Sequence, residues 1–255
     1  MSKLPEQHQF VDLSDYGRSA ARVIARSLKN TNFTPIHVTL VFTFSGLIAI
    51  YCILNDFLVL AAIFLVIKSI LDAADGELAR IKKTPSYTGR YFDSIADIIL
   101  NLLIMLAICK TSDVSISYTL IAFVGLQLQG TLYNYYYVIL RNKLGGDTTS
   151  RIIENEAPIA MKGEEQKHVQ RLFYIYQFLY GYFDRIIYRL DKNATEGIVF
   201  PNWFMTVISM LGLGFQLLLI SIMLILGWKE YIVPFFIGYT FLIILFVFIR
   251  KKWLK

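Results

Sequence analysis

LDAADGELAR (residues 71–80) and GRYFDSIAD (residues 89–97) place four aspartates in a chain that is otherwise strongly apolar. Ionisable side chains at membrane depth are costly, and they are kept mainly where they pair, bind a cation or line a wet cavity. Asp72, Asp75, Asp93 and Asp97 lack a matching set of basic neighbours. These two segments therefore predict a cation site inside a membrane protein.

The composition indicates an all-α integral membrane protein. The chain has 255 residues, of which 56% are hydrophobic and 17% are charged, whereas soluble domains carry about 25% charged residues. Its apolar runs are close to the ~20 residues that cross the hydrocarbon core of a bilayer. We predict a six-helix bundle within residues 35–255, preceded by a separate segment at 1–34. The predicted spans are 36–54, 57–75, 91–109, 116–140, 203–226 and 231–249.

The basic residues predict the orientation of these spans. Of the 25 Lys and Arg residues, only Lys68, Lys110 and Lys229 lie outside the termini and the connections on one side of the membrane. The positive-inside rule places that side, with both termini and the four aspartates, in the cytoplasm. Because the net charge of +6 follows this pattern, we predict no nucleic-acid partner.

Two segments lie outside the predicted spans. Residues 10–28 carry apolar side chains on one face and three arginines on another, which predicts an amphipathic helix at the membrane interface. A lid that guides substrate is the alternative for this helix. The connection 142–199 predicts a cytoplasmic helical insert with an aromatic helix at 169–190. Aromatic side chains concentrate at membrane interfaces, so this helix should lie along the surface or pack beneath the bundle.

Helical periodicity places the aspartates on facing surfaces. At 100° per residue, Asp72 and Asp75 share one helix face, while Asp93 and Asp97 lie one turn apart on the next helix. If these helices are antiparallel neighbours, the carboxylates converge. Oxygen ligands suit Mg²⁺, Mn²⁺ or Ca²⁺ better than zinc, and four carboxylates suffice for two ions. Arg80, one turn away, is suited to a phosphate oxygen.

The complete pattern is Asp-x₂-Asp-Gly-x₂-Ala-Arg-x₈-Gly-x₃-Asp-x₃-Asp. It resembles the signature of the CDP-alcohol phosphotransferase (CDP-alcohol phosphatidyltransferase) family at all eight positions. The resemblance covers residues 32–140 well and the remainder loosely. It implies an enzyme that transfers a phospho-alcohol group from a CDP-linked alcohol to an acceptor alcohol and releases CMP. It also implies a homodimer in the bilayer.

The resemblance implies a role for individual residues. Asp72, Asp75, Asp93 and Asp97 would hold two Mg²⁺ or Mn²⁺ ions, and Asp97 would also take the proton from the acceptor hydroxyl. Contacts to the cytidine diphosphate would come from Gly76, Ala79, Arg80 and Gly89. A Pro-Asn-x-x-Thr element often opens the first span of such enzymes. Here Ile36 replaces the Asn, so only Pro35 and Thr39 carry over to the nucleotide site.

The acceptor pocket is less well defined by the sequence. Asn101 lies one turn beyond Asp97, and Asn134 and Arg141 belong to a polar stripe on the fourth predicted span. These residues line an acceptor pocket in one interpretation and hydrogen-bond neighbouring helices in the other. Lys68, one turn before Asp72, either counters the carboxylates or extends to the interface.

The sequence leaves the substrates open. Six spans and modest length favour a bacterial-type inner or plasma membrane enzyme that uses CDP-diacylglycerol and a polar alcohol. The long insert leaves room for CDP-ethanolamine or CDP-choline with a diacylglycerol-type acceptor, so at least one substrate is a lipid. A divalent-cation transporter is the alternative from another class. It would require acidic residues across the membrane, and the opposite halves of the predicted spans are apolar.

Overall fold

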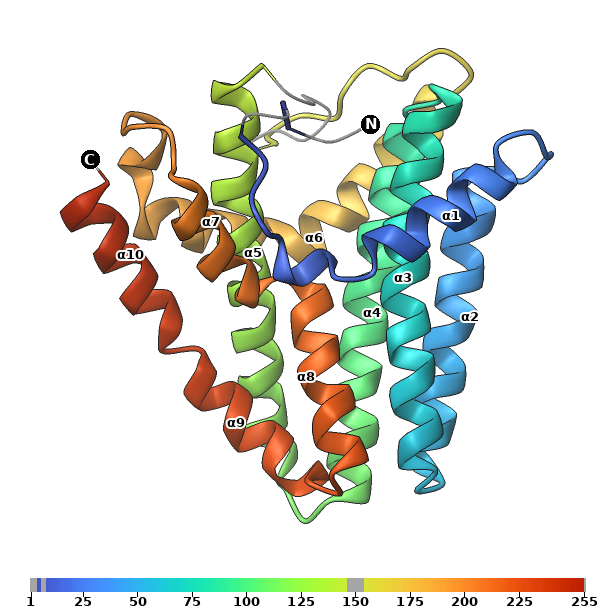
Figure 1. Cartoon of the computed structure of the whole chain (residues 1–255), viewed down its shortest axis with the longest axis vertical. Coiled ribbons are helices and arrows are strands. Elements are labelled where there is room, and N and C mark those ends of the chain that lie inside the picture. Colours follow the sequence, from blue (N-terminus) through green and yellow to red (C-terminus); the bar gives the residue numbers. More distant parts are fainter. Residues whose placement is uncertain (1–3, 6–7, 146–153, 255) are drawn as a thin grey trace.

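The computed structural model describes residues 4–5, 8–145 and 154–254. Within these residues all regular structure is helical, which confirms the predicted all-α class. The long helices lie side by side (Figure 1). In chain order, the α-helices and 3₁₀ helices (η) are η2 (Leu13–Asp15), α1 (Arg18–Leu28), α2 (Pro35–Leu54), α3 (Leu58–Lys82), α4 (Tyr87–Thr111), α5 (Ile116–Lys143), α6 (Gln166–Leu190), η3 (Lys192–Thr195), α7 (Asn202–Ile208), η4 (Ser209–Leu211), α8 (Leu213–Ile225), η5 (Lys229–Tyr231), α9 (Ile232–Tyr239) and α10 (Leu242–Trp253).

The apolar helices are those of a multi-pass membrane protein. Among the described residues, three stretches are long and apolar enough to cross a bilayer: α2, α4 and the segment Lys229–Trp253. The bent pair Asn202–Leu211 and Leu213–Ile225 makes a fourth if it counts as one span. Helices α3 and α5 have 25 and 28 residues but carry more polar side chains, including Lys68 and Gln127. Six crossings therefore remain a prediction.

The predicted span 203–226 is not one straight helix. Its two parts meet at an angle of 53°, at Gly212, whose backbone is extended. The short helix η2 lies against this break, where the Leu13 amide donates to Ser209 Oγ over 2.9 Å. A side chain at Gly214 would collide with the Ser14 carbonyl. The predicted span 231–249 is likewise interrupted between α9 and α10.

The amphipathic helix begins later than the predicted residue 10. Asp12 caps the turn η2 through the Ser14 amide, and α1 starts only at Arg18. Its buried Ala21 and Ala25 belong to one cluster with Ala74 and Leu78 of α3. Small side chains allow two helices to approach closely, so α1 is fixed against the helix that carries Asp72 and Asp75. A position at the membrane interface, or a role as a lid, remains a prediction.

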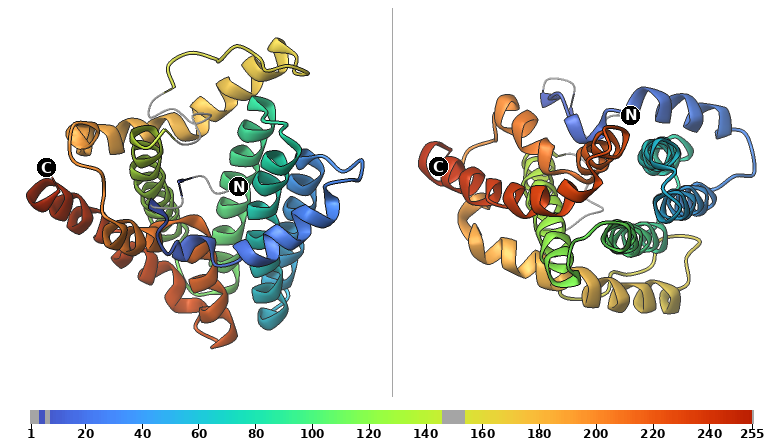
Figure 2. Two further views of the ribbon diagram at one scale, coloured as in Figure 1. Left: turned by 45° about the horizontal axis from the view of Figure 1, so that its top comes forward. Right: turned by 90° about the horizontal axis from the view of Figure 1, so that it is seen from below.

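The aromatic helix of the insert is confirmed as α6, which begins three residues earlier than predicted. It crosses the flank formed by α4 and α5 (Figure 2). Val169 and Phe173 pack with Tyr91 and Ile95 of α4, while Tyr174 and Phe178 are exposed. Helix α6 therefore packs against both α4 and α5 on one flank of the molecule. Residues 146–153 of the predicted insert lie outside the described residues.

The insert also holds the start of α4 through Glu164. Its carboxylate accepts hydrogen bonds from Ser86 Oγ at 2.8 Å, the Thr88 amide at 2.7 Å and the Tyr87 amide at 3.1 Å. A carboxylate at a helix N-terminus satisfies free amides and opposes the helix dipole favourably. Partial burial alone would raise the pKa of Glu164, but the hydrogen bonds from Thr88, Ser86 and Met161 outweigh it and lower that pKa.

Replacing Glu164 should loosen this junction. We expect Glu164→Gln to lower the free energy of unfolding in detergent at pH 7 by about 1–2 kcal/mol, because a charged cap is lost. The folded-state pKa lies below the ordinary value of 4.5, so the contribution is complete above that value and is lost as the pH falls through the folded-state pKa. Thermal unfolding of both proteins from pH 7 to below pH 4 checks this.

The matched control is Glu165→Gln. The neighbouring Glu165 side chain is 75% exposed, so its replacement should leave the melting temperature nearly unchanged. Equal shifts for the two variants would show that the hydrogen bonds of Glu164 do not stabilise the start of α4.

Candidate metal centre

Helices α3 and α4 bring three of the four aspartates together. Both helices pack against α2, and each presents carboxylates to the same space. One oxygen each from Asp72, Asp75 and Asp93 lies within 4.8 Å of the others. Asp75 is buried and the other two are half-buried. Three negative charges at this separation repel one another strongly unless a cation lies between them.

The three carboxylates, hereafter the trio, fit a divalent ion. One oxygen from each carboxylate lies within 4.8 Å of the other two, so modest movements of the three side chains would let them bind the same ion. Asp93 Oδ1 is buried and has no hydrogen-bond partner among the described residues, as expected of an oxygen reserved for a cation. Carboxylate oxygens also suit Mg²⁺ and Mn²⁺ chemically. The trio is therefore a candidate site for one of these ions.

Asp97, the fourth aspartate, pairs with Lys68 instead of joining the trio. Lys68 of α3 has 0% of its surface exposed, and its Nζ donates to Asp97 Oδ1. The same ammonium lies 4.9 Å from the centre of the Phe42 ring of α2. Lys68 thus counters a carboxylate and does not extend to the interface. The predicted roles of Asp97 as a metal ligand and proton acceptor remain predictions.

The start of α2 contributes to the centre through Thr39. Its Oγ1 donates to Asp75 Oδ2 over 2.6 Å, in a buried hydrogen bond. Pro35 occupies the first turn of α2, and Thr34 caps the helix, so Thr39 lies one turn inside it. Hydrogen bonds of this kind orient a metal-ligating carboxylate. Of the two residues predicted from the opening element, Thr39 therefore contacts a member of the trio directly.

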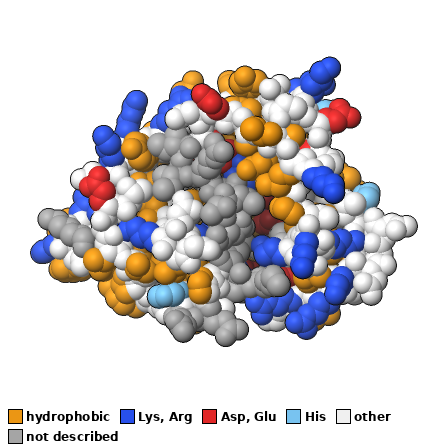
Figure 3. Space-filling view, turned by 90° about the horizontal axis from the view of Figure 1, so that it is seen from above, with side chains coloured by type: hydrophobic (Ala, Val, Ile, Leu, Met, Phe, Trp, Pro, Cys, Tyr) orange, Lys and Arg blue, Asp and Glu red, His pale blue; other side chains and the backbone are white. Residues whose placement is uncertain are grey.

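The other predicted nucleotide-binding residues lie near the same end of α3 and α4. Arg80 Nη2 donates to Glu77 Oε2 at 2.7 Å, and a side-chain carbon at Gly76 would lie 3.5 Å from Arg80 Nη1. The Ala79 carbonyl accepts a hydrogen bond from the Thr84 amide at the end of α3. The Gly89 amide donates a hydrogen bond to Ser86 Oγ at the start of α4. From above, acidic side chains are visible in a recess beside a group of Lys and Arg side chains (Figure 3).

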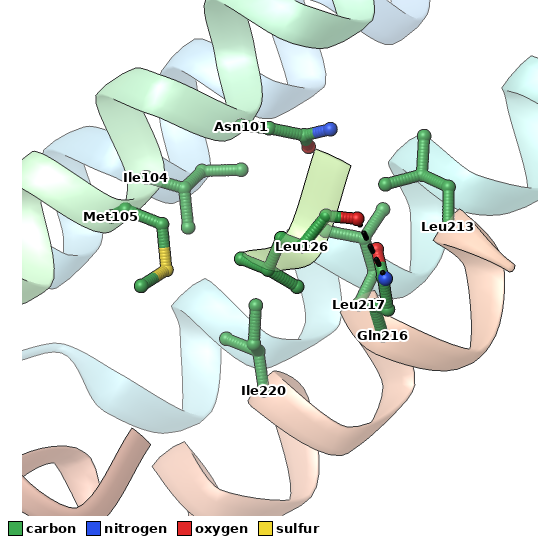
Figure 4. A pocket seen from close by; sticks show the side chains of 8 residues that line it. All are labelled: Asn101, Ile104, Met105, Leu126, Leu213, Gln216, Leu217 and Ile220. Carbon is green, nitrogen blue, oxygen red and sulfur yellow. Dashed lines mark hydrogen bonds between the residues drawn. The ribbon is translucent and has the colours of Figure 1, made fainter. Parts of the chain in front are cut away.

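Of the three residues predicted for the acceptor pocket, one lines a small pocket in the described part of the chain. Asn101 lines a small pocket among α4, α5 and α8, where Gln216 Nε2 donates to the Leu126 carbonyl over 3.1 Å (Figure 4). The other lining side chains are apolar. Asn134 is exposed, and the buried guanidinium of Arg141 lies 5.1 Å from the centre of the Tyr137 ring. Neither of these two lines this pocket.

The sequence did not indicate that the insert would contact the motif. The Glu154 carboxylate accepts two hydrogen bonds from the Arg90 guanidinium, of 2.5 and 2.7 Å, and a third hydrogen bond from the Tyr91 hydroxyl. These partners are more than 60 residues apart, so no local spacing predicts them. Arg90 lies between Gly89 and Asp93 within the motif. The insert therefore anchors the first turn of α4 at a second point.

Helix α6 also presents aromatic side chains toward the aspartates. The Tyr176 ring lies 5.2 Å from both Tyr91 and Tyr180, and it is stacked on Tyr180. Burial, followed by the charge of Asp97, raises the pKa of Tyr180 well above its ordinary value. Tyr180 thus interacts electrostatically with Asp97. The aromatic run in the sequence predicted only an interfacial helix.

Comparison with known proteins adds independent evidence. The family model of CDP-alcohol phosphatidyltransferases matches residues 32–160. No curated protein matched the chain. The matched region contains α2, α3, α4 and α5, and thus the trio, Asp97, Lys68 and Thr39. Because the match extends over half of the chain and includes every position of the aspartate pattern, this protein belongs to the CDP-alcohol phosphatidyltransferase family.

Proposed function

We propose that this protein synthesises a phospholipid by transferring a phosphatidyl group from CDP-diacylglycerol to a polar alcohol, with release of CMP. The observation that carries the proposal is the carboxylate trio within the family pattern. Family membership supports phosphotransfer from a CDP-alcohol, and the apolar helices support a lipid substrate. The choice of CDP-diacylglycerol rests on the length and the predicted span number of the chain.

The reaction exchanges one phosphate ester bond for another. The acceptor oxygen bonds to the phosphorus that carries the donor alcohol, while the bond from this phosphorus to the bridging oxygen breaks. The bridging oxygen leaves with CMP, and the acceptor proton passes to Asp97. Divalent ions supply charge neutralisation for the diphosphate. We assign the binding of two such ions to the trio together with Asp97.

The remaining assignments concern how the substrates are held. We assign the cytidine diphosphate to Gly76, Ala79, Arg80 and Gly89, with Pro35 and Thr39 from α2. The position of Arg80 one turn beyond the trio supports contact with a phosphate, for which the Arg80–Glu77 ion pair would open. For the acceptor we keep Asn101, Asn134 and Arg141. Asn101 has the strongest support, because it lies one turn beyond Asp97 on α4 and lines a pocket.

We further propose six crossings, with both termini and the metal centre at the cytoplasmic face of an inner or plasma membrane. The two more polar long helices, α3 and α5, run beside α2 and α4, which supports their crossing too. We expect a homodimer, as the family resemblance implies. Exposed apolar side chains such as Phe44 of α2 and Phe241 before α10 suit a hydrophobic environment of lipid or a second copy.

The test is CMP release by the purified protein in detergent with Mg²⁺ or Mn²⁺. CDP-diacylglycerol is offered with serine, inositol phosphate or glycerol phosphate, and CDP-ethanolamine or CDP-choline is offered with diacylglycerol. We expect metal-dependent CMP from CDP-diacylglycerol and one polar alcohol. Asp93→Asn should reduce the rate about 1,000-fold or more, because a metal ligand contributes several kcal/mol to transition-state stabilisation.

The control for this variant is Asp56→Asn, which removes an exposed carboxylate paired with Lys229. Its rate should equal that of the wild type. CMP from CDP-ethanolamine or CDP-choline would replace the proposed donor, whereas Mn²⁺ flux into vesicles without any CMP would favour cation transport.

Thr39 provides a finer test of the metal centre. Thr39→Val removes the hydrogen bond to Asp75 while preserving shape, so we expect Mn²⁺ affinity and CMP release to fall about 10-fold. Thr43→Val is the matched control one turn along α2, because the Thr43 hydroxyl donates to the Thr39 carbonyl. Isothermal titration with Mn²⁺ distinguishes the two, and equal losses would attribute the effect to the packing of α2.

A further inference from the structure

Lys68 is a fully buried cation within the group of four aspartates. Its side chain has 0% exposure, against 11% for that of Asp97. The ammonium donates to one oxygen of Asp97 and lies over the Phe42 ring. It also interacts electrostatically with Asp72 and Asp93. A buried ammonium is stable only when its charge is compensated. Lys68 is therefore a fixed positive charge of the site.

This fixed charge limits how many metal ions the carboxylates can accept. The four carboxylates carry four negative charges, and Lys68 offsets one. One divalent ion at the trio leaves one negative charge, whereas a second ion would leave a net positive charge in a poorly solvated site. Uncompensated charge in such surroundings is unfavourable. A diphosphate brings at least two negative charges, so it restores the balance for a second ion.

The contacts agree with this count of charges. Asp93 Oδ1 is buried without a hydrogen-bond partner among the described residues, so the trio has an oxygen available for a first ion. Asp97 Oδ1, by contrast, already accepts from Lys68. A second ion that used this oxygen would have to displace the ammonium or approach it closely. Repulsion between the two cations would weaken its binding until a diphosphate is present.

We propose that Lys68 is a positioning residue whose ammonium pairs with Asp97 where a second metal ion would otherwise bind. The resting enzyme then binds one divalent ion, and it binds the second ion only together with the nucleotide. This inference rests on the proposed metal-dependent transfer and deepens it, because it assigns an order of binding. It also gives the four aspartates two roles. The trio binds the first ion, and Lys68 keeps Asp97 in position for the acceptor hydroxyl.

The experiment counts Mn²⁺ ions bound to the full chain in detergent, from the electron paramagnetic resonance signal of free Mn²⁺. CDP is the probe, because it carries the same diphosphate without the lipid. We expect one ion per chain without CDP and two with CDP. Lys68→Met removes the charge and should allow two ions without CDP. Lys68→Arg retains the charge and should behave like the wild type.

Two further variants separate this role from a purely structural one. The double variant Lys68→Met with Asp97→Asn removes both charges of the pair, so it avoids an unpaired buried carboxylate, and it should bind one ion without CDP. Lys229→Met removes a cation that pairs with Asp56, far from the trio in sequence, and should leave the count at one. If Lys68→Met does not fold, the counts for the wild type with and without CDP still decide the order of binding.

The outcomes are distinct. Two ions in the wild type without CDP, or one ion with saturating CDP, would overturn the order of binding. One ion in folded Lys68→Met without CDP would remove Lys68 from the control of metal binding. Failure of the wild type to bind Mn²⁺ under any condition would instead overturn the proposed metal-dependent function, and this inference with it.

Discussion

Mutual repulsion among four carboxylates is the constraint on which this structure depends. Three of them, Asp72, Asp75 and Asp93, face one another within 4.8 Å, and the fourth is offset by the buried Lys68. A bilayer cannot solvate such charges, so the protein must surround them with donors, cations or substrate. Thr39 of α2 supplies one donor. The chemistry of the family uses the same charge to bind metal ions.

Helix α2 sets the geometry of this site. Both α3 and α4 pack against it, and the buried Phe42 of α2 forms one cluster with Ala96 and Leu100 of α4. A side-chain carbon at Gly46 would lie only 2.9 Å from Leu100, so α2 and α4 approach closely there. The separation of α3 from α4, and hence of their aspartates, depends on this shared packing surface.

The insert after α5 supports the site, although it is distant from the aspartates in the sequence. Glu164 caps α4, and Glu154 forms an ion pair with Arg90. Two carboxylates of the insert therefore hold the start of the helix that carries Asp93 and Asp97. Helix α6 then presents Tyr176 and stacked Tyr180 on the same side. Charges that would otherwise need water are satisfied within the protein. The insert is thus part of the support of the site as well as a connection between helices.

The sequence by itself determined the helical class, the long apolar helices, the family and the residues of the aspartate pattern. These features are local, because helix periodicity fixes which side chains share a face and the whole aspartate pattern lies within one short stretch of the chain. The sequence also placed Thr39 near the site, although the signal was an incomplete motif.

Only the tertiary structure decided that Lys68 pairs with Asp97, 29 residues away, and that the helix breaks at Gly212 to accommodate η2. The Leu13–Ser209 contact at that break spans 196 positions. Periodicity shows which face of a helix is buried but not which distant group lies against it, because that partner is selected by the packing of the whole chain.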